Sequence, residues 1–372
     1  MERSEARNWL ALCLVRGLGP VGWLRLHHEF GGPDAILGAS VSSLRQAGAG
    51  DKVASAIASF NEWDRVDQGL DLLDGLDARM VSIDEPEYPE ALRQMHDPPP
   101  VLFVRGKLTV GDEMALAVVG TRKAGEYGLH AARMLSYHVA ASGVTIISGL
   151  ALGIDAQAHW GAINAKGRTV AVLGSGLDAP GPAANRELAD GIADNGAIVT
   201  EFPPQVAPHP GNFPRRNRII AGLSTAILVV ESPKKSGSLI TVKYALEQGK
   251  EVLVVPGRID DPNFEGSHQL IREGAKPVFH ATDILEIAVP EAARRMETTE
   301  PFVVEVSSRK AKEKLPADLA RVYGEVGVEP IDVDAVARKA GLTSAEVLSI
   351  LLELELRNLV QQLPGKRYKR TE

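Results

Sequence analysis

The chain has 372 residues, of which 44% are hydrophobic and 24% charged, a composition typical of about two or three folded domains. Its net charge of −7 excludes a uniformly basic, histone-like surface, so any site for a polyanion must be a local patch. A single cysteine, Cys13, excludes an intramolecular disulfide and a structural zinc site built from thiolates. The apolar run at 9–15 is too short for a membrane span and its flank is too acidic for a signal peptide, so we expect a cytoplasmic protein with no membrane contact.

Residues 1–75 are predicted to form a helical domain. Apolar residues recur there at helical spacing, and Gly17-Leu18-Gly19-Pro20 indicates a tight turn that enters a helix at Pro20. This layout resembles helix-hairpin-helix and SAM-like modules, some of which bind DNA phosphates through hairpin amides. The segment holds seven basic and ten acidic residues, which favours the alternative interpretation, a small protein-contact domain.

Residues 76–289 are predicted to form an α/β core, because short β-branched runs alternate with amphipathic helices. The clearest strands are at 115–119, 145–148, 169–173, 197–200, 226–230 and 251–255. Each ends in a turn rich in small residues. Ligands of open parallel sheets bind beyond the carboxyl ends of the strands, so this edge is the candidate site.

Residues 290–316 are interpreted as a linker, because they are rich in charged and polar side chains. The segment 317–372 is predicted to hold three helices, at 317–326, 333–340 and 344–357, and a hairpin at 358–368. Three helices followed by a hairpin are typical of a winged helix.

The third of these helices carries three acids, Glu346, Glu353 and Glu355, against one base, Arg357. Laying it along DNA phosphates would be repulsive, so we expect the winged helix to serve mainly in protein contact or regulation. DNA binding is the alternative, through basic residues of the wing and tail, which are Lys366, Arg367, Lys369 and Arg370.

The densest chemical signal lies at 205–245, where six basic residues stand against one acid, Glu231. The basic residues are Arg215, Arg216, Arg218, Lys234, Lys235 and Lys243. Three arginines preceded by the aromatic Phe213 suit phosphate contacts combined with base stacking, as in proteins that bind single strands. The alternative is that some of these arginines pair with Glu201 and Glu231 in the core.

Two glycine-rich turns are candidate anion sites, because their amides and the helix that follows point one way. They are Ser148-Gly149, which leads towards a helix with Asp155 and His159, and Gly174-Ser175-Gly176. Such turns fit dinucleotide binding equally well, but neither has the G-x-G-x-x-G spacing, and no G-x-x-x-x-G-K-[ST] loop is present. A hydrogen bond between His159 and Asp155 is expected to be structural.

The sequence contains few residues in patterns suited to catalysis or metal binding. No G-x-S-x-G elbow occurs, and the nine histidines show no metal-ligand spacing. We therefore expect no catalytic residue, no cofactor and no metal.

Several motifs, taken in order, resemble the DNA-processing DprA (Smf) family over residues 80–285. They begin at Val119-Gly120-Thr121-Arg122, Ser148, Ala171, Phe213-Pro214-Arg215-Arg216 and Ser236-Gly237-Ser238. The resemblance implies an extended Rossmann-like core, with the helical and winged-helix modules of longer members. It also implies a homodimer that binds single-stranded DNA, protects incoming DNA in natural transformation and loads the RecA recombinase, without catalytic activity.

A few positions depart from the family pattern. Gly125 stands where serine is frequent, and His268 stands where asparagine is usual. Gly181 replaces the tyrosine of a Tyr-Pro-x-x-Asn element that keeps Asn185, and Ala183 replaces a basic residue for which Arg186 is a substitute. These departures concern single phosphate contacts.

The sequence therefore predicts a groove that binds single-stranded DNA independently of base sequence. Its expected members are Arg122, Ser148, Gly149, Gly174, Ser175, Gly176, Asn185, Arg186, Phe213, Arg215, Arg216, Asn217, Arg218, Ser236, Gly237, Ser238 and Lys243. Arginines and Lys243 would neutralise phosphates, glycine-rich turns would offer amides, and Phe213 would stack a base. The dimer is expected to form near Leu270 and Ile271.

Two rival interpretations come from other classes of protein. The first is a Rossmann-like nucleotide-processing enzyme of the phosphoribohydrolase type. Such enzymes normally carry the motif Pro-Gly-Gly-x-Gly-Thr-x-x-Glu, which is absent here, and Glu247 lies too far after the turn at Ser236-Gly237-Ser238 to replace its glutamate. The second is a winged-helix transcription factor with a ligand-sensing core, which would require specificity for a DNA duplex.

Overall fold

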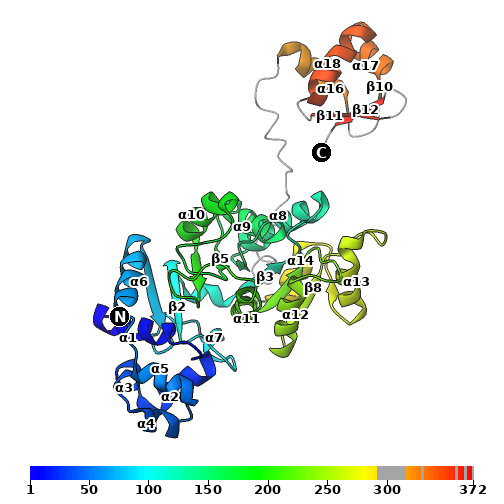
Figure 1. The fold of residues 1–372 in the computed structure, drawn as a ribbon. Coiled ribbons are helices and arrows are strands. Elements are labelled where there is room, and N and C mark those ends of the chain that lie inside the picture. Colours follow the sequence, from blue (N-terminus) through cyan, green and yellow to red (C-terminus); the bar gives the residue numbers. More distant parts are fainter. Residues whose placement is uncertain (291–315, 328–330, 357–358, 364–366, 371–372) are drawn as a thin grey trace. The chain divides into compact units, whose positions relative to one another are not determined.

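The computed structural model describes residues 1–290, 316–327, 331–356, 359–363 and 367–370 (Figure 1). The chain divides into two compact units, Met1–Glu300 and Pro301–Glu372. Within the described residues no helix is long and apolar enough to cross a membrane.

The first unit opens with six helices (Figure 1, blue). Their hydrophobic core includes two tryptophans, Trp9 and Trp23. The rings of Trp9 and Trp23 stack with centroids 4.7 Å apart, and both side chains are fully buried. The second helix begins at Pro20, as the sequence predicts. The bounds are α1 (Arg3–Leu14), α2 (Pro20–Phe30), α3 (Pro33–Leu37), α4 (Val41–Gln46), α5 (Asp51–Ala58) and α6 (Trp63–Gly75).

A nine-stranded sheet follows, in the order β1-β2-β6-β5-β4-β3-β7-β8-β9. The six strands predicted from the sequence are parallel and are confirmed to within a residue at their ends. They are β3 (Ala115–Val119), β4 (Thr145–Ser148), β5 (Thr169–Val172), β6 (Ala197–Thr200), β7 (Ala226–Val229) and β8 (Glu251–Val254). The sheet is extended by β1 (Ala78–Ser82) and β2 (Val101–Gly106), which pair antiparallel, and by the short β9 (Lys276–Pro277).

Helices cover both faces of this sheet (Figure 1). One face packs against α8 (Glu126–Ala141), α9 (Ile154–Asn164), α10 (Arg186–Asn195) and α14 (Ala281–Ala288). The other packs against α7 (Glu90–Arg93), α11 (Asn212–Leu223), α12 (Ser238–Glu247) and α13 (Glu265–Arg272). Short 3₁₀ turns lie at η1 (Val110–Glu113), η2 (Ala183–Asn185) and η3 (Pro262–Phe264).

The chain reverses its direction of progress across the sheet between β3 and β7. These strands are hydrogen-bonded neighbours in register, with Val119 opposite Val229, but β3 leads to α8 on one face and β7 to α12 on the other. Their carboxyl-terminal loops therefore separate and leave a crevice, which is where open α/β sheets bind ligands.

The second unit has the predicted three helices and hairpin, with one additional short strand. Its elements are α16 (Ala317–Glu325), β10 (Ile331–Asp332), α17 (Val333–Ala340), α18 (Ser344–Leu356), β11 (Val360–Leu363) and β12 (Arg367–Arg370). Gly341 ends α17 in the left-handed conformation, with φ of 64°. Nearly all of the predicted linker, and the turn at 364–366, lie outside the described residues.

Candidate nucleic-acid interface

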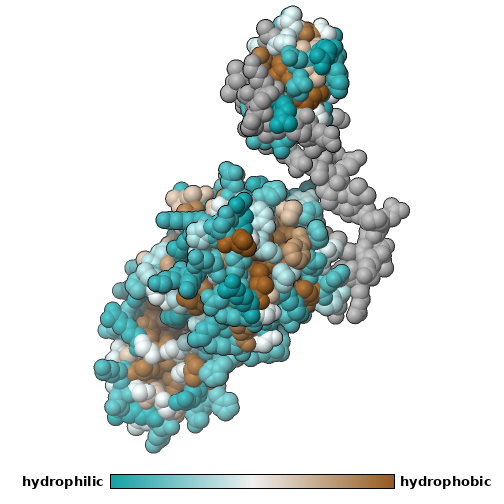
Figure 2. Space-filling view, turned by 90° about the vertical axis from the view of Figure 1, so that its right-hand side faces the viewer, coloured by the Kyte–Doolittle hydropathy of each residue, from teal (hydrophilic) through white to brown (hydrophobic). Residues whose placement is uncertain are grey.

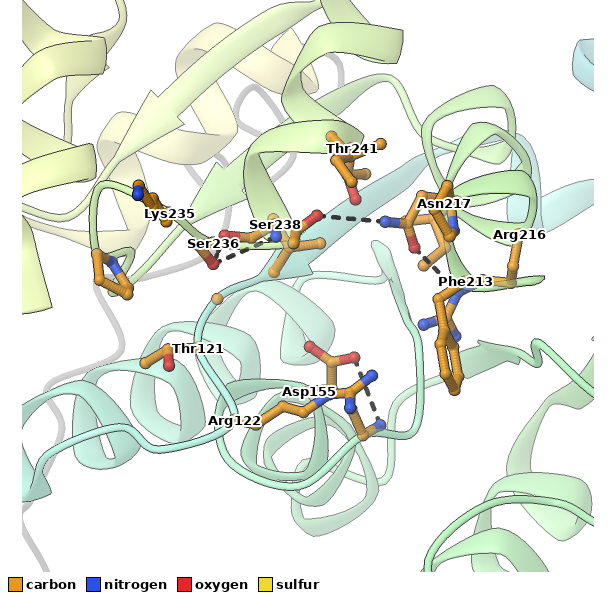
Figure 3. Close-up of a pocket in the computed structure, with 18 of the residues that line it drawn as sticks. Thr121, Arg122, Asp155, Phe213, Arg216, Asn217, Lys235, Ser236, Ser238 and Thr241 are labelled. Atoms are coloured by element: carbon orange, nitrogen blue, oxygen red, sulfur yellow. Dashed lines mark hydrogen bonds between the residues drawn. The ribbon is translucent and has the colours of Figure 1, made fainter. Parts of the chain in front are cut away.

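A cleft of about 410 Å³ lies where the loops after β3 and β7 meet the first turns of α11 (Figure 3). We call it the central cleft. Seven predicted site residues line it, namely Arg122, Phe213, Arg216, Asn217, Ser236, Gly237 and Ser238. Five other lining residues are not among the expected members, namely Thr121, Lys123, Asp155, Lys235 and Thr241. Thr121 lies inside a predicted motif, and Lys123 and Lys235 directly adjoin predicted motifs. Four of the lining residues are basic and only Asp155 is acidic, so the cleft favours an anion although the whole chain is negative.

Arg122, Lys123 and Lys235 are the accessible cations of this cleft, the first two on the loop after β3 and the third on the loop after β7. All three side chains are exposed, and none forms an ion pair with a described residue. The Arg122 guanidinium lies 4.9 Å from the centroid of the Phe213 ring. Gly174 makes room for that ring, because a Cβ atom at this glycine would lie 2.9 Å from the Phe213 Cδ1 atom.

Arg216 is buried beneath the cleft, with 5% of its surface exposed. Its Nη1 atom donates to the carbonyl oxygens of Gly149, at 2.7 Å, and of Val172, and its Nε atom donates to Asn217 Oδ1 at 3.1 Å. Burial lowers the pKa of Arg216 to about 10, and the nearby charge of Asp155 opposes that shift. The guanidinium therefore supplies fixed positive charge to the cleft from below.

The predicted anion cradles are closed by the protein's own groups. The Gly149 amide donates to Asp155 Oδ2 at 3.1 Å, and the Ser148 hydroxyl donates to the Val118 carbonyl at 2.6 Å. The Gly176 amide donates to Val206, and the Ser175 hydroxyl donates to Ala179. In this structure these four donors bond groups of the chain itself and hold the loops in place, and their role towards phosphates stays a prediction.

Four further predicted residues lie outside the lining of the central cleft. Arg218 is buried and pairs with Glu201 at 2.6 Å, so for this arginine the alternative of a core ion pair is the one observed. Asn185 donates to the carbonyl of Leu150, whose φ of 53° is left-handed, and so it holds the loop after β4. Lys243 pairs with Glu247 at 3.7 Å on α12, and Arg186 is exposed on α10.

Arg215, the remaining predicted arginine, points away from the central cleft. Its guanidinium lies 5.0 Å from the centroid of the Phe202 ring and 3.4 Å from Glu201 Oε2. Its side chain is half-exposed.

Serine hydroxyls line the opposite wall of the cleft, at the start of α12. The hydroxyls of Ser236 and Ser238 (Figure 3) lie 2.7 Å apart. The Ser238 hydroxyl also lies 3.0 Å from that of Ser232. The amide group of Asn217 reaches the Gly237 carbonyl at 3.4 Å and ties α11 to this wall. Hydroxyls and a helix amino terminus are suited to hydrogen bonding an anion.

His159 does not bond Asp155, contrary to the sequence-based expectation. The Thr169 hydroxyl donates to the Ile146 carbonyl at 2.8 Å, so His159 Nδ1 must carry the proton that it donates to Thr169 at 2.7 Å. Burial first, and the charge of Arg216 second, lower the pKa of His159 to about 3. No group of three or more potential metal ligands occurs among the residues that the structure describes.

Of the two residues predicted for a dimer interface, Leu270 is 8% exposed and packs in the core beside α12 and α11. Ile271 is only partly buried. A contact with a second chain at this place would thus use Ile271, while Leu270 supports α13 from inside.

The open, mainly parallel sheet and its basic cleft define a Rossmann-like protein. The chain belongs to the DNA recombination-mediator protein A family, which matches residues 79–288, and a DprA winged helix domain matches residues 306–366. The family and the fold class predicted from the sequence are confirmed. The matched core lacks β1's first residue and otherwise spans the whole sheet.

Relatives match between about half and nearly all of the chain. Protein Smf of Escherichia coli is 38% identical over 97% of this chain and 95% of its own. The X-ray structure of DNA processing protein A from Streptococcus pneumoniae aligns with a TM-score of 0.67 and 31% identity, over 75% of this chain and 97% of its own. A Helicobacter pylori structure, described for the single-stranded DNA binding mode of that protein, aligns with a TM-score of 0.52 and 27% identity, over 57% of this chain and 97% of its own.

Proposed function

We propose that the central cleft binds single-stranded DNA through its phosphates, largely independently of base sequence. The observation that carries this proposal is the group of three exposed cations, Arg122, Lys123 and Lys235, on two loops that face each other across the cleft. None of them has an ion-pair partner among the described residues, so their charge is free for a ligand. The solved relative from Helicobacter pylori, which is described by its single-stranded DNA binding, supports the same ligand.

Phe213 supplies the second component of such a site, an aromatic face at the cleft wall. A base that stacks beside this ring would gain about 1–3 kcal/mol, and stacking tolerates every base. Few side chains of the central cleft are placed to read the edge of a base pair, which favours sequence-independent binding.

The role is binding and not catalysis. Ser236 and Ser238 bond each other, and no histidine or carboxylate is hydrogen-bonded to either one in the described part of the chain. Nucleophilic catalysis requires such a base beside the hydroxyl. A phosphoribohydrolase-type enzyme is therefore the weaker alternative.

In the cell, we propose that the protein acts in the cytoplasm as a homodimer. It would protect incoming single-stranded DNA during natural transformation and would load the RecA recombinase onto it. This part of the proposal rests on membership of the family.

Binding to three ligands in parallel tests the function. Fluorescence anisotropy would compare a single-stranded oligonucleotide, the same sequence as a duplex, and competition by nucleoside monophosphates. We expect the single strand to bind most tightly and monophosphates to compete weakly. Tight binding of a monophosphate with hydrolysis of its glycosidic bond would favour the enzyme, and preference for a duplex would favour a transcription factor.

A further inference from the structure

A second cleft, of about 420 Å³, lies between the helical segment and the core of the first unit. One wall is formed by the end of α1, the turn at 16–20 and Trp23. The other wall is formed by the loop after β6 and by the first turn of α11. The central cleft does not use these residues, and we call this feature the second cleft.

The rim of the second cleft is basic. Arg16, Arg65 and Arg215 line it, and Glu201 is the one acidic lining residue among those described. Arg16 is exposed and has no ion pair with a described residue, Arg65 pairs with its helical neighbour Glu62 at 3.0 Å, and the half-exposed Arg215 lies 3.4 Å from Glu201. Arg16 therefore brings an unpaired positive charge to the rim, inside a helical segment whose net charge is negative.

Two polar atoms of buried lining residues have no hydrogen-bond partner. Glu201 is 4% exposed in its side chain, and its Oε2 atom accepts from Arg218, but its Oε1 atom has no donor. The indole Nε1 of Trp23 has no acceptor. Buried polar groups are nearly always satisfied, so an unpaired carboxylate oxygen in a cleft points to a ligand that brings an N–H group.

The two clefts lie on opposite sides of the same helix terminus. Asn212 and Arg215 line the second cleft, whereas Phe213, Pro214 and Arg216 line the central cleft. The amino terminus of the 12-residue α11, which carries partial positive charge, therefore stands between them. A flexible polyanion that occupies the central cleft can continue across this terminus.

We propose that the second cleft is a second subsite for the same single strand and that it takes an unpaired base through an N–H group on its Watson–Crick edge. This inference rests on the proposed function of the central cleft. Arg16 and Arg65 would contact phosphates, and Glu201 Oε1 would accept from the amino group of cytosine, adenine or guanine or from the N3–H group of thymine. The second subsite would therefore accept every base, as the central cleft does.

Strands of different length distinguish the contributions of the two subsites to binding. Binding of strands of about 4 and about 16 nucleotides would be measured with the full-length protein and with Arg16→Ala, Arg65→Ala and Arg122→Ala. We expect Arg16→Ala and Arg65→Ala to weaken binding of the long strand severalfold and to lower its salt slope by about 0.7 each, with little effect on the short strand. Arg45→Ala, a change of equal charge on α4 outside both clefts, is the control.

Unchanged affinity and salt slope of Arg16→Ala and Arg65→Ala for the long strand would overturn the second subsite. Failure of the wild type to bind either strand would instead overturn the proposed function itself, so the two failures are distinguishable. Loss of short-strand binding in Arg122→Ala, but not in Arg16→Ala or Arg65→Ala, would support the central cleft as the site of the short strand.

Discussion

Arg122 and Arg216 are both predicted to contact phosphates, but their environments differ. Arg122 is exposed over Phe213, whereas Arg216 is buried and donates to the carbonyls of Gly149 and Val172. The sequence shows both as arginines beside a glycine-rich loop, and burial depends on how α11 packs under β4 and β5. Pattern reasoning could therefore find these residues but could not assign their roles.

Gly149 is predicted to be intolerant of a side chain. A Cβ atom there would lie 2.4 Å from Arg216 Nη1, so Gly149→Ala should displace the guanidinium and lower the free energy of unfolding by about 1–3 kcal/mol. Urea unfolding measures this change. Gly237→Ala is the matched control, because a Cβ at Gly237 meets no atom within 4 Å; equal stability of the two variants would contradict the packing described.

The buried, neutral His159 is expected to lower the free energy of unfolding in acid. Its pKa of about 3 in the folded chain lies below the ordinary value of 6.5, so only the unfolded chain takes up the proton between these values. Stability from this group is complete above pH 6.5 and is lost as the pH falls towards 3. The wild type should lose about 1.4 kcal/mol per pH unit more than His159→Asn, which keeps a donor near Thr169. Parallel curves of unfolding free energy against pH would be inconsistent with a buried neutral imidazole.

At the scale of elements, the sequence predicted the parallel strands well and the antiparallel ones not at all. Strands β3 to β8 are short apolar runs that end in small residues, and this signal is local. Strand β1 contains Arg79, and β2 follows the proline run at 98–100, so neither has a clear period. Their pairing with each other and with β6 is a long-range contact that no local pattern encodes.

The sequence predicts a single binding edge formed by the loops after the strands, whereas the structure has two separate clefts. Six turns were expected to converge, but the split arises because α11 places its amino terminus between two groups of lining residues. The position of that helix depends on the pairing of Arg218 with Glu201 and Asp97, and on Lys250, whose Nζ donates to the carbonyls of Ala221, Gly222 and Ser224 at its other end.

The winged helix is predicted to contribute little to DNA affinity. On α18, Glu346 is exposed and accepts from the amide and hydroxyl of Thr343, so its acid caps the helix. Deletion of residues 301–372 should leave most single-strand affinity in the first unit, which has its own hydrophobic cores. Loss of more than tenfold in affinity on this deletion, measured by anisotropy, would require a second DNA site in the winged helix.

For the whole molecule, the family predicts a homodimer. On the face of the first unit drawn in Figure 2, hydrophobic residues form separate patches among hydrophilic ones. Light scattering at micromolar concentrations should give twice the chain mass of 39.8 kDa. Ile271→Asp should shift this value towards the monomer, because Ile271 is the accessible member of the predicted pair. A wild-type monomer under these conditions would refute the predicted dimer.

The salt dependence of single-strand binding tests the central cleft most directly. Each phosphate contact to a single strand adds about 0.7 to the slope of log affinity against log salt concentration. The double variant Arg122→Ala/Lys235→Ala should therefore bind more weakly and with a slope lower by about 1.4, whereas Arg45→Ala/Lys52→Ala, outside both clefts, should match the wild type. The same affinity and slope in the wild type and in both double variants would contradict the assignment of the central cleft as the DNA site.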